Sequence, residues 1–344
     1  MRISFNIPTY NRAKYLKQNL DILTTQIKEL HKEDEVEINI SDNASTDETK
    51  QVSEACIAAN PQLHISYYCN EKNLGPDGNF IAAMHLAKGE YSLLWGDDDF
   101  LKKGGLARIF ELAEYGDKND IQLMLSSTSL YDKNGNYTGE KPFLREDIDE
   151  LTVDFSDLAQ ARAYFFLLKD MGGMLSFISD VVYKTSIINE IPFDEDFMGT
   201  HYAFLCYWWG WLAKGKKLYY SNQAFLKETL QYQSAYGYGV DRVMVDYKGY
   251  TLIANKFFEK ETLKKDFLSA FQNLHNVLCV MYLVYGDSKK YNHILIPKLK
   301  ECGVSDESIA ETKRFCGSKS TFKLFLYSFV PTCIFNVLKS LKKR

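Results

Sequence analysis

Apolar and polar side chains alternate at the start of the chain. Ile3, Phe5 and Ile7 fall on one face of an extended segment, and Pro8 ends its ladder. From about Ala13 the period changes, and apolar residues recur at steps of four and three, at Leu16, Leu20, Leu23, Ile27 and Leu30. That spacing places them on one face of a helix, so the chain is predicted to begin with a strand and an amphipathic helix.

The two patterns then repeat. Further strands are predicted at residues 36–40, 65–68, 91–95 and 123–126, and helices between 45 and 59, 80 and 87, and 105 and 115. Ser45 and Glu48 have the spacing of a capping box for the first of these helices. Strands that alternate with helices predict an α/β fold, with a mostly parallel central sheet flanked by helices.

Polar motifs follow four of the predicted strands. In chain order they read IPTYNR, SDNASTD, NEKNLG and GDDD. Ligands of parallel α/β sheets bind beyond the carboxyl ends of the strands, and all four motifs are expected at that edge. The sequence therefore predicts one ligand site built from them.

The rest of the chain changes character twice. Residues 132–157 are charged and turn-rich, which predicts a hairpin or surface excursion, whereas 158–225 are apolar and aromatic. Residues 240–316 have a helical pattern with a charged surface, and the segment from 320 to 344 is apolar with a basic end. The apolar part of this tail is shorter than the ~20 residues that span a bilayer, and its basic end suits an anionic membrane surface. A terminal helix packed on the core is the other interpretation.

Composition narrows the class of protein. The net charge of −4 gives no sign of a nucleic-acid partner. The seven cysteines are scattered without a CxxC pair, and no signal-peptide pattern opens the chain, which favours reduced thiols in the cytoplasm over a zinc site. Aromatic residues make up 14% of the chain; aromatic-rich cores are favoured over aromatic walls for sugar rings.

Three adjacent carboxylates carry the clearest chemistry. Asp97, Asp98 and Asp99 follow an apolar strand directly and repel one another unless a cation balances them. Mg²⁺ or Mn²⁺ suits oxygen ligands and would neutralise charge on a leaving diphosphate. A solvated acidic turn that caps the next helix is the alternative.

Side chains of the other motifs suit a nucleotide. Asp42 can accept a hydrogen bond from a nucleobase or a ribose hydroxyl, and Tyr10 either stacks on a base or packs in the ordinary way. Asn11 and Arg12 open the first helix, where phosphate binds well. Asn73 belongs to a turn before the third helix.

In this order and spacing the four motifs resemble the family 2 glycosyltransferases, inverting enzymes of the GT-A fold. The resemblance is strong over residues 1–125 and weaker over 126–225, and the GDDD form is similar to the abequosyltransferase-like branch of bacterial surface polysaccharide synthesis. It implies a nucleotide-sugar-binding half at residues 1–130, an acceptor-binding half at 131–235, and a helical C-terminal region with a membrane-associating tail at 236–344.

The resemblance also implies roles for single residues. It places a nucleoside-diphosphate sugar on Pro8, Tyr10, Asn11, Arg12, Asp42, Asn73 and Asp98, and Mn²⁺ or Mg²⁺ on Asp97 and Asp99. Many relatives carry an Asp where Gly96 stands here, so which two of the three carboxylates bind the metal stays open.

The general base departs from the family pattern. Family members usually place a Glu-Asp pair, whose Asp is the base, a dozen or so residues before a segment like WGWLAKGKK. No such pair falls at that offset here. Asp196 lies several residues early and fits the family chemistry, His201 lies nearer and histidine titrates near neutral pH, and Asp180 is a third option.

The implied activity is inverting transfer of a sugar to a hydroxyl of a glycan acceptor, such as a lipid-linked oligosaccharide of O-antigen synthesis. The enzyme would work at the cytoplasmic face of the cell membrane as a peripheral protein. Two alternatives remain: a nucleotide-sugar-binding protein that lost its base, and a nucleotidyltransferase. The second is disfavoured because IPTYNR lacks the glycines of such enzymes.

Overall fold

The computed structural model describes residues 1–132, 135–229 and 240–285, together with 293, 296–301, 306 and 310. The chain divides into two compact units: the first is Met1–Tyr232 with Leu252–Phe267, and the second is Gln233–Thr251 with Leu268–Arg344. The apolar and basic tail at 320–344 lies outside the described residues.

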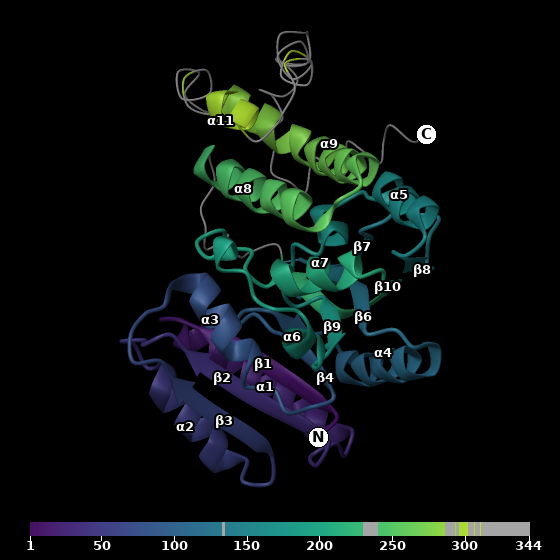
Figure 1. Ribbon diagram of the computed structural model, residues 1–344. Helices are drawn as coiled ribbons and strands as arrows, with labels where there is room; N and C mark the ends of the chain where they lie inside the picture. Colours follow the sequence, from purple (N-terminus) through teal and green to yellow (C-terminus); the bar gives the residue numbers. More distant parts are fainter. Residues whose placement is uncertain are drawn as a thin grey trace. The chain divides into compact units, whose positions relative to one another are not determined.

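One sheet organises the first unit (Figure 1). Its first four strands are parallel neighbours in the order β3-β2-β1-β4, with bounds Ile3–Thr9 for β1, Val36–Asp42 for β2, His64–Cys69 for β3 and Tyr91–Leu94 for β4. The predicted strand and helix alternation is therefore confirmed for this part of the chain.

The other side of the sheet has mixed strand directions. It continues from β4 through β9 (Val181–Lys184), β6 (Leu123–Tyr131), β10 (Lys217–Thr229) and β5 (Phe100–Leu101). Strand β9 runs antiparallel to both β4 and β6, while β6 and β10 are parallel. Two shorter strands, β7 (Tyr137–Lys141) and β8 (Glu150–Asp154), pair with β6 and β10, so the charged segment after β6 turns back as a hairpin.

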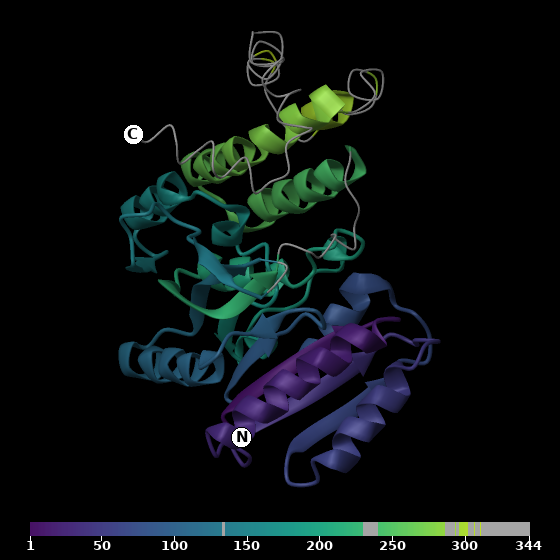
Figure 2. The same cartoon turned by 180° about the vertical axis from the view of Figure 1, so that it is seen from behind.

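Helices pack on the sheet, and the first of them does so through the apolar face that the sequence predicts. Their bounds are Ala13–Glu29 for α1, Thr49–Ala59 for α2, Gly75–Met84 for α3 and Gly105–Asn119 for α4. Leu16, Leu20, Leu23 and Ile27 of α1 are buried in one core with the apolar residues of β1, β2 and β4. Helices α1 and α2 lie side by side (Figure 2), and α3 packs on β1, β2 and β4.

The predicted capping box at Ser45 and Glu48 is wrong. Glu48 precedes α2 but its side chain caps nothing, and the Ser45 hydroxyl accepts a hydrogen bond from the Asn11 backbone N–H, 2.8 Å away. Asp47 does the capping instead: one carboxylate oxygen accepts from the Thr49 N–H (3.1 Å) and the other from the Ala13 N–H (3.0 Å). The loop after β2 therefore holds the start of two helices.

Aromatic side chains fill the core beside α5 (Leu158–Leu167) and α7 (Leu205–Ala213). Trp209 of α7 lies 4.9 Å from Phe267 and 6.1 Å from Phe165, measured between ring centroids. Short elements connect these helices, namely η1 (Met171–Met174), α6 (Ile187–Glu190) and η2 (Glu195–Phe197).

The chain after β10 is mostly helical in the parts that the structure describes. Helix α8 covers Val240–Phe257, α9 covers Glu261–Tyr285 and α11 covers Ile296–Glu301. In the second unit, Tyr247 and Tyr250 pack on Phe271 with ring centroids 4.8 and 4.7 Å apart. Within the described ranges, no helix has both the length and the apolar character needed to cross a bilayer.

Candidate active site

The carboxyl ends of β1, β2 and β4 bring three polar motifs together. Thr9 at the end of β1 is in register with Asp42 at the end of β2. Beyond β4 the pairing with β1 continues, because the Trp95 N–H donates to the Asn6 carbonyl at 2.9 Å. The Thr9 hydroxyl then donates to the Asp97 carboxylate at 2.7 Å, so the predicted convergence at this edge is confirmed for these motifs.

Arg12 bridges two of the three adjacent carboxylates. Its guanidinium Nε lies 2.8 Å from Asp97 Oδ1, and one of its terminal nitrogens pairs with Asp98. Asp97 is buried, and burial raises its pKa to about 7; the nearby Asp98 charge adds to this effect, whereas Arg12 and the Thr9 hydrogen bond oppose it. The sequence predicted that a metal ion balances the negative charge of the three carboxylates. The structure shows that Arg12 balances part of that charge.

Asp99 faces a different partner. Its Oδ2 accepts a hydrogen bond from the hydroxyl of Ser179, a buried residue just before β9. The same hydroxyl accepts from the Gly96 N–H at 2.8 Å, and Asn19 of α1 donates to the Gly96 carbonyl at 2.8 Å. The GDDD turn is therefore fixed from two sides, and nothing in the local pattern around Ser179 signalled its part.

Asp42 is also buried and held by two donors. Its Oδ2 accepts from the Tyr67 hydroxyl at 2.6 Å, and its Oδ1 accepts from the Ser45 N–H at 2.9 Å. Burial and the bond to Asp42 raise the pKa of Tyr67. Beyond Pro8, which is buried in β1, the loop presents Tyr10 with 42% of its surface exposed.

Asparagine side chains connect the remaining motif, NEKNLG after β3, to the same edge of the sheet. Asn43 donates its backbone N–H to the Thr9 carbonyl (2.9 Å) and its side-chain amide to Asn73 Oδ1 (2.9 Å). Asn73 Oδ1 also accepts from the Gly75 N–H at 2.8 Å, and Gly75 has the positive φ of +73° that glycine adopts without strain. Between the loops that follow β1 and β2, Asn11 Oδ1 accepts a hydrogen bond from the Thr46 N–H at 2.7 Å. Sequence reasoning missed Asn43, because its contacts are with residues that are distant in sequence.

The three candidate bases occupy different surroundings. The backbone N–H of His201 donates to Asp77 Oδ2 at 2.8 Å, and the Ala203 N–H donates to Asp77 Oδ1 at 3.1 Å. Asp77 lies in the first turn of α3, which starts at the Asn73 turn. These contacts connect His201 to the edge where the polar motifs meet.

Asp196 and Asp180 lie in opposite environments, one exposed and the other buried. The Asp196 carboxylate is 63% exposed and pairs with Lys256 Nζ at 2.6 Å, which also pairs with Asp194 at 2.8 Å. Asp180 is fully buried, and neither of its carboxylate oxygens has a hydrogen-bond partner among the described residues. Burial raises its pKa well above the usual range, and the charge on Asp99 adds to this shift.

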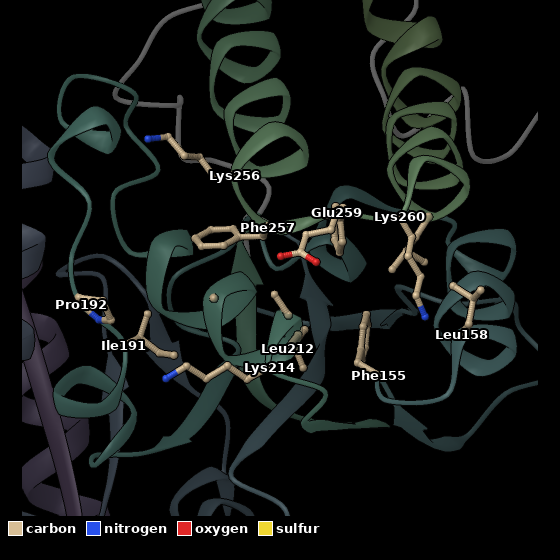
Figure 3. A pocket seen from close by; sticks show the side chains of 14 residues that line it. Phe155, Leu158, Ile191, Pro192, Leu212, Lys214, Lys256, Phe257, Glu259 and Lys260 are labelled. Carbon is tan, nitrogen blue, oxygen red and sulfur yellow. The ribbon is translucent and has the colours of Figure 1, made fainter.

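A cavity of about 460 Å³ lies elsewhere in the first unit (Figure 3). Apolar residues such as Phe155, Ile191, Leu212 and Phe257 form much of its wall, and Lys256 is at its edge. None of the predicted site residues lines it. The polar edge at the strand ends is therefore the candidate active site.

The carboxylates of this edge suit a divalent cation that shares its ligands with a phosphate. No three His, Cys, Asp or Glu side chains gather into a metal cage in the part of the chain that the structure describes. Mg²⁺ is commonly held by one or two carboxylates plus substrate phosphates, and Asp97 and Asp99 supply hard oxygen atoms of that kind. Their chemistry fits such an ion, with Arg12 sharing Asp97.

Comparison with solved structures identifies the fold. Staphylococcus aureus TarS 1–349 in complex with UDP-GlcNAc is similar with a TM-score of 0.61 at 20% identity, over 90% of this chain and 83% of TarS. A mannosyltransferase from Pyrobaculum calidifontis, in complex with GDP-Man and Mn²⁺, gives a TM-score of 0.54 at 14% identity, over 91% and 83%. The first unit has the GT-A fold, as predicted.

Sequence comparison then defines the family. The model of glycosyl transferase family 2 matches residues 4–166. The abequosyltransferase RfbV of Salmonella typhimurium is 34% identical over 278 residues, 80% of each chain. A Campylobacter jejuni GalNAc(5)-diNAcBac-PP-undecaprenol β-1,3-glucosyltransferase is 27% identical over 227 residues, which cover 65% of this chain and 63% of the relative. The chain belongs to glycosyltransferase family 2, and the predicted resemblance is confirmed.

Proposed function

We propose that the chain is an inverting glycosyltransferase that uses a divalent metal ion and moves a sugar from a nucleoside-diphosphate sugar to a hydroxyl of a glycan acceptor. The observation that carries this proposal is the arrangement at the strand ends, where Asp97 contacts both Thr9 and Arg12 and where Thr9 is in register with Asp42. Such an edge offers acceptors for a nucleoside, a cation for a diphosphate, and carboxylates for a metal.

Residues 1–130 would bind the donor. Asp42 would accept hydrogen bonds from the nucleoside, and Tyr10, which is exposed, would stack on the base. Arg12 stands at the start of α1, where its charge and the helix N–H groups favour phosphate oxygens. The other donor-binding residues we assign are Pro8, Asn11, Asn73 and Asp98.

Asp97 and Asp99 would hold Mn²⁺ or Mg²⁺. When bound, the metal would supply positive charge to the leaving diphosphate. Of the two carboxylates, Asp99 is the principal ligand in this proposal, as the resemblance to family 2 implies. The residues that bind the acceptor would come from 131–235.

His201 is the base we assign. As the acceptor hydroxyl oxygen attacks the anomeric carbon, its proton passes to the imidazole of His201, the bond to the nucleoside diphosphate breaks, and the configuration inverts. The link from His201 through Asp77 to the start of α3 supports this choice. Asp180 is enclosed, and Asp196 is exposed and paired with Lys256.

The acceptor we propose is a lipid-linked oligosaccharide of surface polysaccharide synthesis. The Campylobacter jejuni relative is named for an undecaprenol-linked substrate and the Salmonella typhimurium relative for abequosyl transfer. A peripheral position on the cytoplasmic face of the membrane, through the basic tail at 320–344, would bring the enzyme to such an acceptor. Flotation of the full chain with anionic vesicles, reversed by high salt, tests this position; failure to float would refute it.

The decisive experiment screens nucleoside-diphosphate sugars with and without Mn²⁺, using lipid-linked glycans as acceptors and mass spectrometry of the product. Asp99→Ala should abolish transfer, while Asp21→Ala, which changes an exposed carboxylate of α1, should not. NMR of the product linkage tests inversion. Near-normal transfer by Asp99→Ala with metal present would refute the metal role of Asp99.

The same assay separates the two alternatives. A nucleotide-sugar-binding protein would bind a donor in calorimetry and transfer nothing to any acceptor. A nucleotidyltransferase would release pyrophosphate from a nucleoside triphosphate and form a nucleoside-diphosphate sugar. Sugar transfer with release of a nucleoside diphosphate would exclude both.

A further inference from the structure

Ser179 lies between the backbone of the GDDD turn and the carboxylate of Asp99. It is fully buried and comes from the segment just before β9, about 80 residues further along the chain. Its hydroxyl accepts from the Gly96 N–H at 2.8 Å and donates to Asp99 Oδ2. Because a backbone N–H can only donate, the serine hydroxyl receives that bond on oxygen and directs its own hydrogen to Asp99.

Gly96 leaves the space that this arrangement needs. A Cβ atom at position 96 would lie 2.3 Å from Asp99 Oδ2 and 3.4 Å from Ser179 Oγ. The first distance is far inside van der Waals contact, so any side chain at this position would displace the carboxylate. Asp99 therefore folds back over its own turn only because residue 96 is a glycine.

We propose that Ser179 is a positioning residue for Asp99, and that Gly96, which has no side chain, leaves the space that Asp99 needs in this position. The inference rests on the proposed function, in which Asp99 is the principal metal ligand. A carboxylate fixed by one directed hydrogen bond presents its oxygens in one orientation, so less conformational freedom is lost when a cation binds. Loss of such a partner typically lowers metal affinity by about 10- to 100-fold.

Ser179→Ala tests the proposal by a direct measurement of metal binding. Mn²⁺ binding to the full-length protein is followed by electron paramagnetic resonance, with Mn²⁺ alone and with Mn²⁺ plus UDP, CDP or GDP. We expect Mn²⁺ affinity to fall about 10- to 100-fold in Ser179→Ala and to stay within about threefold of wild type in Ser179→Thr, which keeps the hydroxyl. In turnover, Ser179→Ala should raise the Mn²⁺ concentration needed for half-maximal rate more than it lowers the rate at saturating Mn²⁺.

Ser53→Ala is the matched control. Ser53 is also a fully buried serine, and its hydroxyl donates to the Thr49 carbonyl of α2 at 2.9 Å, with no contact to the GDDD turn. Ser53→Ala deletes one buried hydroxyl, as Ser179→Ala does, and should leave Mn²⁺ affinity unchanged. A non-specific effect of removing a buried hydroxyl would lower Mn²⁺ affinity in both variants, whereas a positioning role lowers it only in Ser179→Ala.

Gly96→Ala approaches the same contact from the other side and leaves the Ser179 side chain in place. It should weaken Mn²⁺ binding as Ser179→Ala does, and it decides the question if Ser179→Ala does not fold. Wild-type affinity for Mn²⁺ in a folded Ser179→Ala or Gly96→Ala protein would overturn the positioning role while leaving the proposed function standing. If the wild-type protein binds no Mn²⁺ with any of the three nucleotides, the metal role in the proposed function falls, and this inference with it.

Discussion

Asp97 should make the folding stability depend on pH in an unusual direction. Burial raises its pKa from the ordinary 3.8 to about 7 in the folded chain. A carboxyl group with a higher pKa in the folded chain than in the unfolded chain holds its proton more tightly in the folded state. The stabilisation that protonated Asp97 gives the folded chain is therefore fully present below pH ~3.8 and is lost as the pH rises towards 7.

The size of this effect follows from the shift. The difference between 3.8 and about 7 corresponds to about 4 kcal/mol. Roughly 2–3 kcal/mol of this difference is lost between pH 5 and pH 8. Carboxylates with lowered pKa values, such as Asp47 and Asp117, act in the opposite direction, so only a difference between two proteins isolates Asp97.

Asp97→Asn provides that difference, because the amide does not titrate. Urea unfolding of both proteins is followed at pH 5, 6, 7 and 8 without metal or nucleotide. The free energy of unfolding of the wild type minus that of Asp97→Asn should fall by roughly 2–3 kcal/mol across this range. Arg12→Met removes a charge that lowers the Asp97 pKa, so it should move the loss to higher pH.

The control variant is Asp98→Asn. Its carboxylate is 29% exposed and pairs with the same arginine, so the variant changes the charge next to Arg12 without removing the buried carboxyl group. The wild type minus Asp98→Asn difference should therefore vary much less with pH. A wild type minus Asp97→Asn difference that stays constant from pH 5 to pH 8 would show that Asp97 is an ordinary ionised carboxylate, and the reasoning from its burial would be wrong.

Three further substitutions test the proposed site. Asp42→Ala should weaken nucleotide binding by about 1–3 kcal/mol in calorimetry, and an unchanged dissociation constant would remove Asp42 from the site. His201→Ala should lower turnover ~10²–10⁴-fold with donor affinity kept, and turnover close to wild type would exclude it as the base. Asp196→Ala breaks one exposed ion pair of Lys256, so it should leave the free energy of unfolding nearly unchanged and preserve turnover; a collapse of turnover would make Asp196 the base instead.

The parts of the fold that the sequence predicts are those where local periodicity and strand order suffice. Alternation in β1 and β2 and the helical spacing in α1 identify these elements, and the rule for parallel sheets places Asp42 and Asp97 at one edge. Strand β9, by contrast, enters antiparallel between β4 and β6, and no local pattern reports such a neighbour.

The contacts that complete the site were beyond the sequence for a related reason. Ser179, Asn43 and Asp77 each act on residues distant in sequence, and a polar side chain in isolation gives no sign of its partner. The capping box failed in the same way, since the Ser45 hydroxyl has a competing donor at Asn11 that only the folded chain brings near. Burial and ion pairing, which distinguish the surroundings of the three candidate bases, are likewise not encoded by the spacing of residues.

The hydrogen bonds between Asp77 and the main chain have a consequence for how the chemistry of this enzyme can change. Asp77 binds the backbone N–H groups of residues 201 and 203, so it fixes the position of residue 201 whatever side chain that residue carries. The backbone there has φ of +61°, a conformation that aspartate and asparagine tolerate better than most residues. An aspartate at position 201 would therefore lie in the same place, and the hydrogen bonds to Asp77 would be unchanged. In the proposed function, where residue 201 supplies the base, Asp77 thus fixes the position of that base independently of its chemistry, and a nitrogen base and an oxygen base would occupy the same place.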